Sequence, residues 1–122
     1  MATFTGNDDA NTIVGTVAAD TIFGRAGDDV LFGRNGVDRI LGEGGNDSLF
    51  GESGADLLYG GAGNDHIDGG AGNDLIRGGG EDDQIKGGMG NDTIHGTVGA
   101  NVLTGGGGDD VIDGRGGNDT VV

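Results

Sequence analysis

Aliphatic residues recur at every ninth position of this chain. Written from Gly6 in rows of nine, the sequence gives thirteen rows that end at Val122 without an insertion or a deletion. The eighth position of the row is Ile, Leu or Val in all thirteen, from Ile13 to Val121. The seventh and ninth positions are more variable, so one apolar residue alternates with mixed neighbours, as in a strand with one inward side chain. Each row therefore predicts a very short strand over positions seven to nine.

The first six positions of the row are rich in glycine, asparagine and aspartate. The first position is Gly in all thirteen rows, and the fourth is Gly in ten. The sixth is Asp in eleven rows and Asn in the other two, at Asn11 and Asn101. These residue types suit tight turns and positive φ angles. We therefore expect a loop before every strand, at a spacing too short for βαβ units.

A regular loop and strand every nine residues predicts a solenoid. Two rows per turn would give two parallel sheets, with the thirteen aliphatic residues stacked between them. In that arrangement residues eighteen apart lie side by side, which places Arg25 beside Glu43 and Arg34 beside Glu52. A triangular helix with three rows per turn is the alternative, and it aligns fewer opposite charges. A collagen helix is excluded, because proline is absent and the seventh position is never Gly.

Composition and charge restrict the partners of such a solenoid. The chain has 122 residues, enough for one domain, with 32 Gly and no Cys, which excludes disulfides and thiolate metal sites. Its formal net charge of −15 excludes nucleic acid, which needs a basic surface, and favours cations. High charge with low hydrophobicity also predicts disorder when no cation is bound.

The sixth-position aspartates would form two columns in a two-row turn. Adjacent turns lie roughly 4.8 Å apart, and two carboxylates at that distance repel by about 3–4 kcal/mol at an effective dielectric of 20. Because this repulsion would recur between every pair of adjacent turns, the stacked turns require cations between their carboxylates. Carboxylate and main-chain carbonyl oxygens are hard ligands that match calcium or magnesium, and calcium tolerates the flexible geometry of two facing loops.

The rows Gly60–Asp68 and Gly69–Arg77 resemble a known repeat. They read GGAGNDHID and GGAGNDLIR, and they match G-G-x-G-x-D-x-U-x, the calcium-binding nonapeptide of the RTX (repeats-in-toxin, hemolysin-type) family. The resemblance extends from Gly6 to Val122. It implies an all-β fold, a right-handed parallel β-roll with two nonapeptides per 18-residue turn and about six and a half turns. It also implies calcium between loops of successive turns, held by loop carbonyls and by the sixth-position aspartates Asp20, Asp29, Asp38, Asp47, Asp56, Asp65, Asp74, Asp83, Asp92, Asp110 and Asp119.

Departures from the motif indicate which rows should bind calcium well and which should bind it weakly. Residues 1–5 form a lead-in, and residues 6–122 form a single domain whose first two rows, residues 6–23, are degenerate and cap-like. The row that carries Asn101 should bind weakly. Rows seven to ten all have Gly at the second position and are nearest the motif, although row nine has Glu81 where Gly is expected. We expect about seven to ten calcium ions per chain, bound through oxygen ligands.

The resulting functional hypothesis is calcium binding coupled to folding, in a secreted, extracellular module exported by type I secretion, as the resemblance implies. The N-terminus has no Sec-type signal peptide, and no apolar run approaches membrane-spanning length. Flanking domains and end-to-end self-association are the other partners expected. We expect no enzymatic activity, because His66 and His95 lie at outward positions and no Ser-His-Asp arrangement is present.

The sequence also allows two functions of other classes. The roll could be an adhesion module for polysaccharide or ice, or a structural or designed repeat scaffold. A stripe of apolar residues at the ninth position either packs beside the strands or forms an interface with another domain or copy; it consists of Phe23, Phe32, Leu41, Phe50 and Tyr59.

Overall fold

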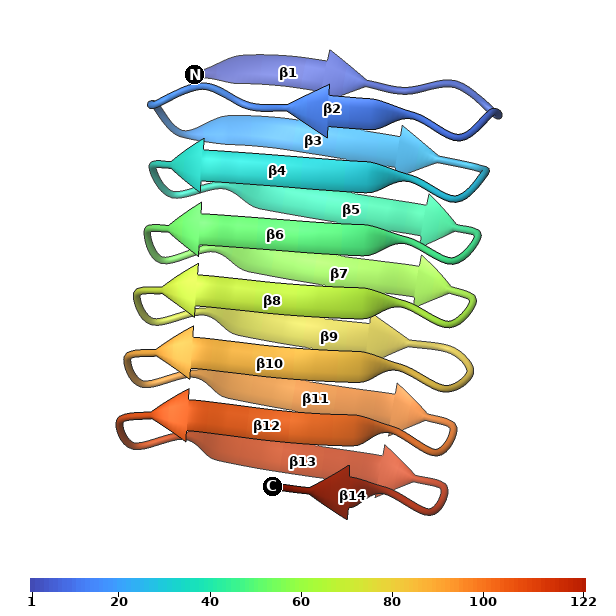
Figure 1. Ribbon diagram of the computed structural model, residues 1–122, viewed down its shortest axis with the longest axis vertical. Coiled ribbons are helices and arrows are strands. Elements are labelled where there is room, and N and C mark those ends of the chain that lie inside the picture. The colour runs from blue at the N-terminus through green and yellow to red at the C-terminus, as the bar shows by residue number, and fades with distance from the viewer.

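The computed structural model describes all 122 residues and contains two parallel seven-stranded sheets that face each other (Figure 1). Successive strands alternate between the sheets, whose orders are β1-β3-β5-β7-β9-β11-β13 and β14-β12-β10-β8-β6-β4-β2. The front strands run to the left and the rear strands to the right as the chain descends, so the coil is right-handed. The fold is the expected parallel β-roll. It contains no helix that could cross a lipid bilayer.

The strands from β3 to β13 have five or six residues each, and the strands at the two ends are shorter. The first sheet contains β1 (Ala2–Thr5), β3 (Asp20–Arg25), β5 (Arg39–Gly44), β7 (Leu57–Ala62), β9 (Leu75–Gly79), β11 (Thr93–Val98) and β13 (Val111–Gly116). The second contains β2 (Thr12–Val14), β4 (Val30–Asn35), β6 (Ser48–Ser53), β8 (His66–Ala71), β10 (Gln84–Met89), β12 (Val102–Gly107) and β14 (Thr120–Val121). Every pairing joins residues eighteen apart, such as Ile40 with Leu58. This register excludes the three-row helix.

The core is one column of eighth-position side chains from each sheet. Ten of the thirteen are buried, and they are Ile22, Leu31, Ile40, Leu49, Leu58, Ile67, Ile76, Ile85, Ile94 and Leu103. Burial of each such side chain contributes about 1.5–3 kcal/mol. Of the other three, Ile13 and Ile112 are only partly buried and Val121 is 59 % exposed, because they lie at the two ends of the stack. Phe4 of β1 is also partly buried and packs against the N-terminal end of the core. The core is therefore a single layer of aliphatic residues, narrow for a domain of this size.

The strands are longer than the pattern predicts. Most of them have six residues and continue through the first three positions of the next row, as Leu57–Ala62 does. Parallel pairing skips the first-position glycine and resumes at the second and third positions, as at Gly88 and Met89. The expected lead-in also contains a strand, β1, which pairs with β3 and adds half a turn at the N-terminal end. The prediction of a six-residue loop in each row was therefore wrong, because the backbone of the first three positions still pairs with the neighbouring turns.

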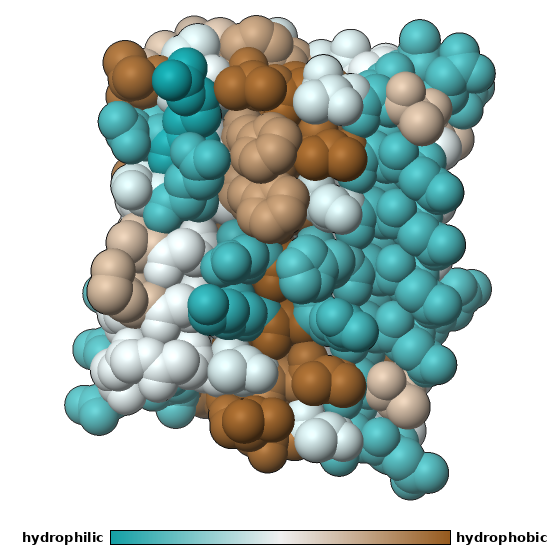
Figure 2. Space-filling view, in the orientation of Figure 1, coloured by the Kyte–Doolittle hydropathy of each residue, from teal (hydrophilic) through white to brown (hydrophobic).

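Side chains eighteen apart are neighbours in the sheets, as expected, but the opposite charges do not pair. Arg25 lies in register with Glu43, and Arg34 with Glu52, yet neither pair makes a salt bridge. Phe32 and Phe50 do interact, with stacked rings whose centroids are 5.0 Å apart. Figure 2 shows apolar side chains gathered over the upper part of this face and polar ones over its middle. Aromatic stacking contributes to register here, whereas ion pairing does not.

Candidate metal sites

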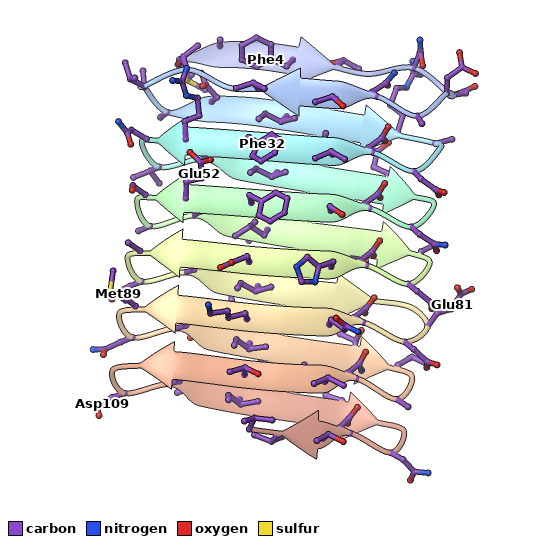
Figure 3. The ribbon with its side chains drawn as sticks, in the orientation of Figure 1. Phe4, Phe32, Glu52, Glu81, Met89 and Asp109 are labelled. Carbon is purple, nitrogen blue, oxygen red and sulfur yellow. The ribbon has the colours of Figure 1, made fainter.

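The sixth-position aspartates lie where each loop enters the next strand, in two columns at opposite edges of the roll. The loops that carry them project at the left and right of Figure 3. Nine of the eleven aspartates are buried, each at most 3 % exposed, together with Asn101. These nine are Asp20, Asp29, Asp38, Asp47, Asp56, Asp65, Asp74, Asp83 and Asp92. The structure therefore brings the expected site residues together in columns and places them inside the fold.

One oxygen of each buried carboxylate joins two turns. Oδ1 of Asp74 accepts a hydrogen bond of 2.8 Å from the backbone N–H of Asp56, which lies eighteen residues earlier. The same bond recurs along both columns, for example from Asp38 N–H to Asp56 Oδ1 at 2.8 Å. Each aspartate thus holds the turn before it in register. This structural role of the sixth position does not involve a metal.

The second oxygen accepts no hydrogen bond. Eight buried carboxylates have an unpaired Oδ2, and they belong to Asp29, Asp38, Asp47, Asp56, Asp65, Asp74, Asp83 and Asp92. A buried acceptor without a donor costs about 1–3 kcal/mol, and a charged one costs more. Eight equivalent cases on one small protein indicate a missing positive partner rather than isolated defects.

The first-position glycine forms the floor of a small cradle beside each unpaired oxygen. A Cβ on Gly69 would meet Asp74 Oδ2 of its own row and would lie 2.6 Å from the carbonyl oxygen of Gly87 in the next turn. The same two oxygens border the first-position glycine in every row from Gly24 to Gly87. Two acceptor oxygens that face one space without a donor between them suit a cation. In all thirteen rows a Cβ at the first position would meet the sixth-position side chain of the same row, which explains why this position is always Gly.

The donor set indicates which cation fits. Nowhere do three His, Cys, Asp or Glu side chains converge. Each cradle is bordered by one carboxylate oxygen and one main-chain carbonyl oxygen. Such oxygen ligands fit calcium or magnesium and exclude the nitrogen and sulfur sites typical of zinc and copper. The residues present therefore fit calcium.

Burial changes the acidity of these carboxylates. Desolvation raises the pKa of Asp56 and of Asp65 from 3.8 to about 7, and the charges of neighbouring aspartates in the same column add to the rise. Burial likewise raises the pKa of Asp74 and of Asp83 to about 6. The cost of burying negative charge is therefore largest in the middle of the columns, where two neighbouring turns exclude water from both sides.

These shifts predict that acid stabilises the metal-free roll. A carboxyl group whose pKa is higher in the folded chain favours folding below its unfolded value, near 4, and this contribution is lost as pH rises through 6 to 7. In chelator, we expect β structure by far-UV circular dichroism to increase as pH falls from 8 to about 4. A chelated chain that becomes less ordered on acidification would contradict the burial of these groups.

The N-terminal rows satisfy their sixth-position side chains internally. The backbone N–H and the hydroxyl of Thr16 donate to Asp20 Oδ2 at 2.6 and 2.8 Å, and Ala2 N–H donates to Asp20 Oδ1 at 2.9 Å. The hydrogen bond from Thr16 N–H is the main reason that the pKa of Asp20 is lowered. Asn11 and Asn7 hydrogen-bond to each other in the first row. All the acceptor oxygens of Asp20 are therefore in use.

The C-terminal rows differ in another way. Asn101 accepts from Asp83 N–H through Oδ1, which turns its Nδ2, a buried donor without a partner, toward Gly96. Asp110 and Asp119 lie in the last turn, where no later turn supplies a carbonyl oxygen above Gly105 or Gly114. Eight complete cradles therefore lie between an N-terminal end closed by hydrogen bonds and an incomplete C-terminal end.

Two features of the site were not predicted. The first is that Thr16 hydrogen-bonds to Asp20. The signal in the sequence is a hydroxyl side chain at the second position of a row that has Asp at its sixth position. The second-position residues have positive φ even where they are not glycine, for example 85° at Arg25 and 79° at Glu43. The cradles of rows three to six therefore have the same form as those of rows seven to ten, so Gly at the second position relieves backbone strain without defining the site.

One comparison with known proteins gave a match. The family model of the RTX calcium-binding nonapeptide repeat matches residues 5–40, 32–67, 50–85, 59–94 and 86–121, which together span almost the whole chain. No curated protein and no solved structure matches the chain.

Proposed function

The chain belongs to the RTX calcium-binding nonapeptide repeat family, and from this premise we propose that it binds calcium in its aspartate columns and folds as it does so. The eight complete cradles are the proposed sites. Their ligands would be the unpaired Oδ2 of Asp29, Asp38, Asp47, Asp56, Asp65, Asp74, Asp83 and Asp92, with first-position carbonyl oxygens of the following turn. Asp110 and Asp119 would be weaker ligands, and Asp20 the weakest of the eleven.

The observation that supports this proposal is the set of eight unpaired, buried carboxylate oxygens in the two aspartate columns. Each Oδ2 is bordered by a carbonyl oxygen and lies over a glycine that leaves room for an ion. The carboxylate comes from one turn and the carbonyl oxygen from the next, so the two oxygens of a cradle meet only when the turns are stacked. Ligands from separate turns meet only in the folded chain, which supports coupling between binding and folding.

The size of the coupling follows from mass action. Calcium supplies the positive charge that the columns lack and accepts the hard oxygen donors that line the cradles. At ten times its dissociation constant, a ligand that binds only the folded state adds about 1.4 kcal/mol per site, or about 11 kcal/mol for eight independent sites. That is comparable with the whole stability of a small domain. The aspartate columns would therefore favour the unfolded chain in low calcium and the roll in high calcium.

We further propose that this switch operates outside the cell. Extracellular calcium modules have dissociation constants of about 10⁻⁴–10⁻³ M, so they fill in millimolar calcium and stay largely free at cytosolic concentrations. An unfolded chain in the cytosol is suited to export by type I secretion. The proposed role is binding and folding without catalysis, since every buried acidic group lies in a repeated structural column.

Equilibrium dialysis against calcium tests the sites by counting. We expect about seven to ten ions per chain, saturating in the millimolar range. Asn101→Asp should increase the count by one, because it replaces the unpaired amide with a carboxylate above Gly96. Asn118→Asp changes charge equally at an exposed loop position and should leave the count unchanged. Binding of two ions or fewer would refute the columns as calcium sites.

A further inference from the structure

An apolar groove with arginines at two corners lies on the outer face of the first sheet. Six residues of three adjacent strands line it: Arg39 and Leu41 of β5, Leu57 and Tyr59 of β7, and Leu75 and Arg77 of β9. The register sets Arg39, Leu57 and Leu75 in one line and Leu41, Tyr59 and Arg77 in the other. The two arginines therefore occupy opposite corners, and the four apolar residues fill the rest of this shallow space of about 400 Å³.

The two arginines of the groove have no acidic partner. The salt bridges of the protein join Asp113 to His95 and to Arg115, at the C-terminal end. Arg39 and Arg77 are exposed, although the chain carries 21 acidic residues against 6 basic ones. Two unpaired cations beside leucines on a strongly acidic protein make this groove a place where an acidic partner is attracted rather than repelled.

The apolar surface continues around the edge of the sheet onto the loops. There the fifth-position residues of successive turns are Met1, Ala19, Val37 and Ala55, and Val37 is 63 % exposed. Further along the same edge, asparagines take over this position and hydrogen-bond between turns, as from Asn91 N–H to Asn73 Oδ1 at 2.8 Å. Beside the groove the fifth-position residues are apolar, so the loops there lack the hydrogen bonds that asparagines make between turns further along the edge. Exposed apolar surface takes the place of these bonds next to the groove.

We propose that this groove binds an acidic, leucine-containing peptide segment of a partner protein. Strands lie about 4.8 Å apart and residues rise about 3.3 Å along a strand, which sets the two arginine Cα atoms about 12 Å apart. An extended segment with acidic residues at positions i and i+4 spans about 13 Å and presents the residue at i+2 on the same face. Both carboxylates then reach an arginine while an apolar side chain at i+2 enters the groove between them.

A second copy of the chain fits the groove poorly. The six lining residues include no carboxylate, so two copies docked face to face on it would leave all four arginines without partners. An anionic polysaccharide offers carboxylates but no aliphatic side chain for the leucines. The combination of two cations with four apolar residues favours a peptide.

Fluorescence anisotropy with a labelled Asp-Ala-Leu-Ala-Asp peptide tests the proposal on the calcium-loaded full chain, after circular dichroism confirms that each variant is folded. We expect saturable binding that is absent for Lys-Ala-Leu-Ala-Lys. The double substitution Arg39→Gln with Arg77→Gln should weaken binding about five- to tenfold, since each exposed ion pair contributes a factor of about two to five. Tyr59→Ser should weaken it as well, because it removes apolar lining.

Lys86→Gln is the matched control for the loss of positive charge. Lys86 occupies the same ninth position as Arg77, but it lies on the opposite sheet in β10. This variant should change the affinity less than about twofold. The proposal is overturned if the acidic peptide does not bind, if Lys86→Gln weakens it as much as the arginine pair does, or if only a polygalacturonate oligosaccharide binds at the arginines.

Discussion

Gly69→Ala should raise the calcium concentration needed for folding severalfold and should remove at least one bound ion. The added methyl group would meet Asp74 Oδ2 and would lie 2.6 Å from the carbonyl oxygen of Gly87. The carbonyl oxygen belongs to a turn held by strand pairing, and the carboxylate is held by the hydrogen bond from Asp56 N–H to its Oδ1. Relieving the clash must therefore move a turn or break that bond, at a cost of about 1–3 kcal/mol or more. The change also fills the cradle itself. Calcium titration by far-UV circular dichroism, with ion counting by dialysis, measures both effects.

Gly107→Ala is the control for this substitution. Gly107 lies in β12, and a Cβ there would meet no atom within 4 Å. Its φ is not positive, so alanine is not strained. We expect an effect within about 0.5 kcal/mol and an unchanged ion count. If both glycine variants behave alike, the first-position glycine is not the floor of a metal site.

Asp74→Ala should have the second largest effect. It removes an unpaired buried oxygen from the cradle above Gly69 and the acceptor that holds Asp56 N–H at 2.8 Å. The lost hydrogen bond contributes about 1 kcal/mol, and the lost site adds its share of the calcium free energy. The calcium midpoint should rise about twofold, which corresponds to a few kcal/mol spread over about eight coupled sites. Dialysis should find one ion fewer.

Asp20→Ala separates ligation from hydrogen bonding. Asp20 is as buried as Asp74, but Thr16 and Ala2 already satisfy its oxygens. The substitution should therefore weaken the N-terminal end at any calcium concentration, raise the midpoint less than Asp74→Ala does, and leave the ion count unchanged. Loss of an ion from the Asp20 variant, or equal midpoint shifts, would refute this ranking of the sites.

The nine-residue pattern of the sequence predicts the features that recur in every turn of the roll. The eighth-position residues form the core, the eighteen-residue register is correct, and the sixth-position aspartates form two columns. The pattern did not predict β1, because Ala2–Thr5 contains neither the first-position glycine nor the aspartate by which rows are recognised. It also placed the ends of the strands too early, since glycine-rich sequence was taken as loop although its backbone still pairs.

The division of labour between the two oxygens of each aspartate could not be derived from residue types. Whether Oδ1 or Oδ2 is satisfied depends on which backbone N–H points at it, and that depends on φ at the second position. Thr16 turns its N–H toward Asp20, whereas Arg25, with a φ of 85°, makes no such bond to Asp29. Residue type alone does not fix this φ, because Thr16 lies outside the positive-φ region whereas Thr97, at the same position of a later row, has a φ of 77°.

Chelation at pH 8 shows whether stacked, buried carboxylates of this density require divalent cations. The expected result is a coil-like far-UV circular dichroism spectrum in excess EDTA, a cooperative gain of β signal in millimolar calcium, and little gain in magnesium at equal concentration. The same β spectrum before and after exhaustive removal of calcium at pH 8 would contradict this requirement, because the aspartate columns would then be stable without any counter-charge.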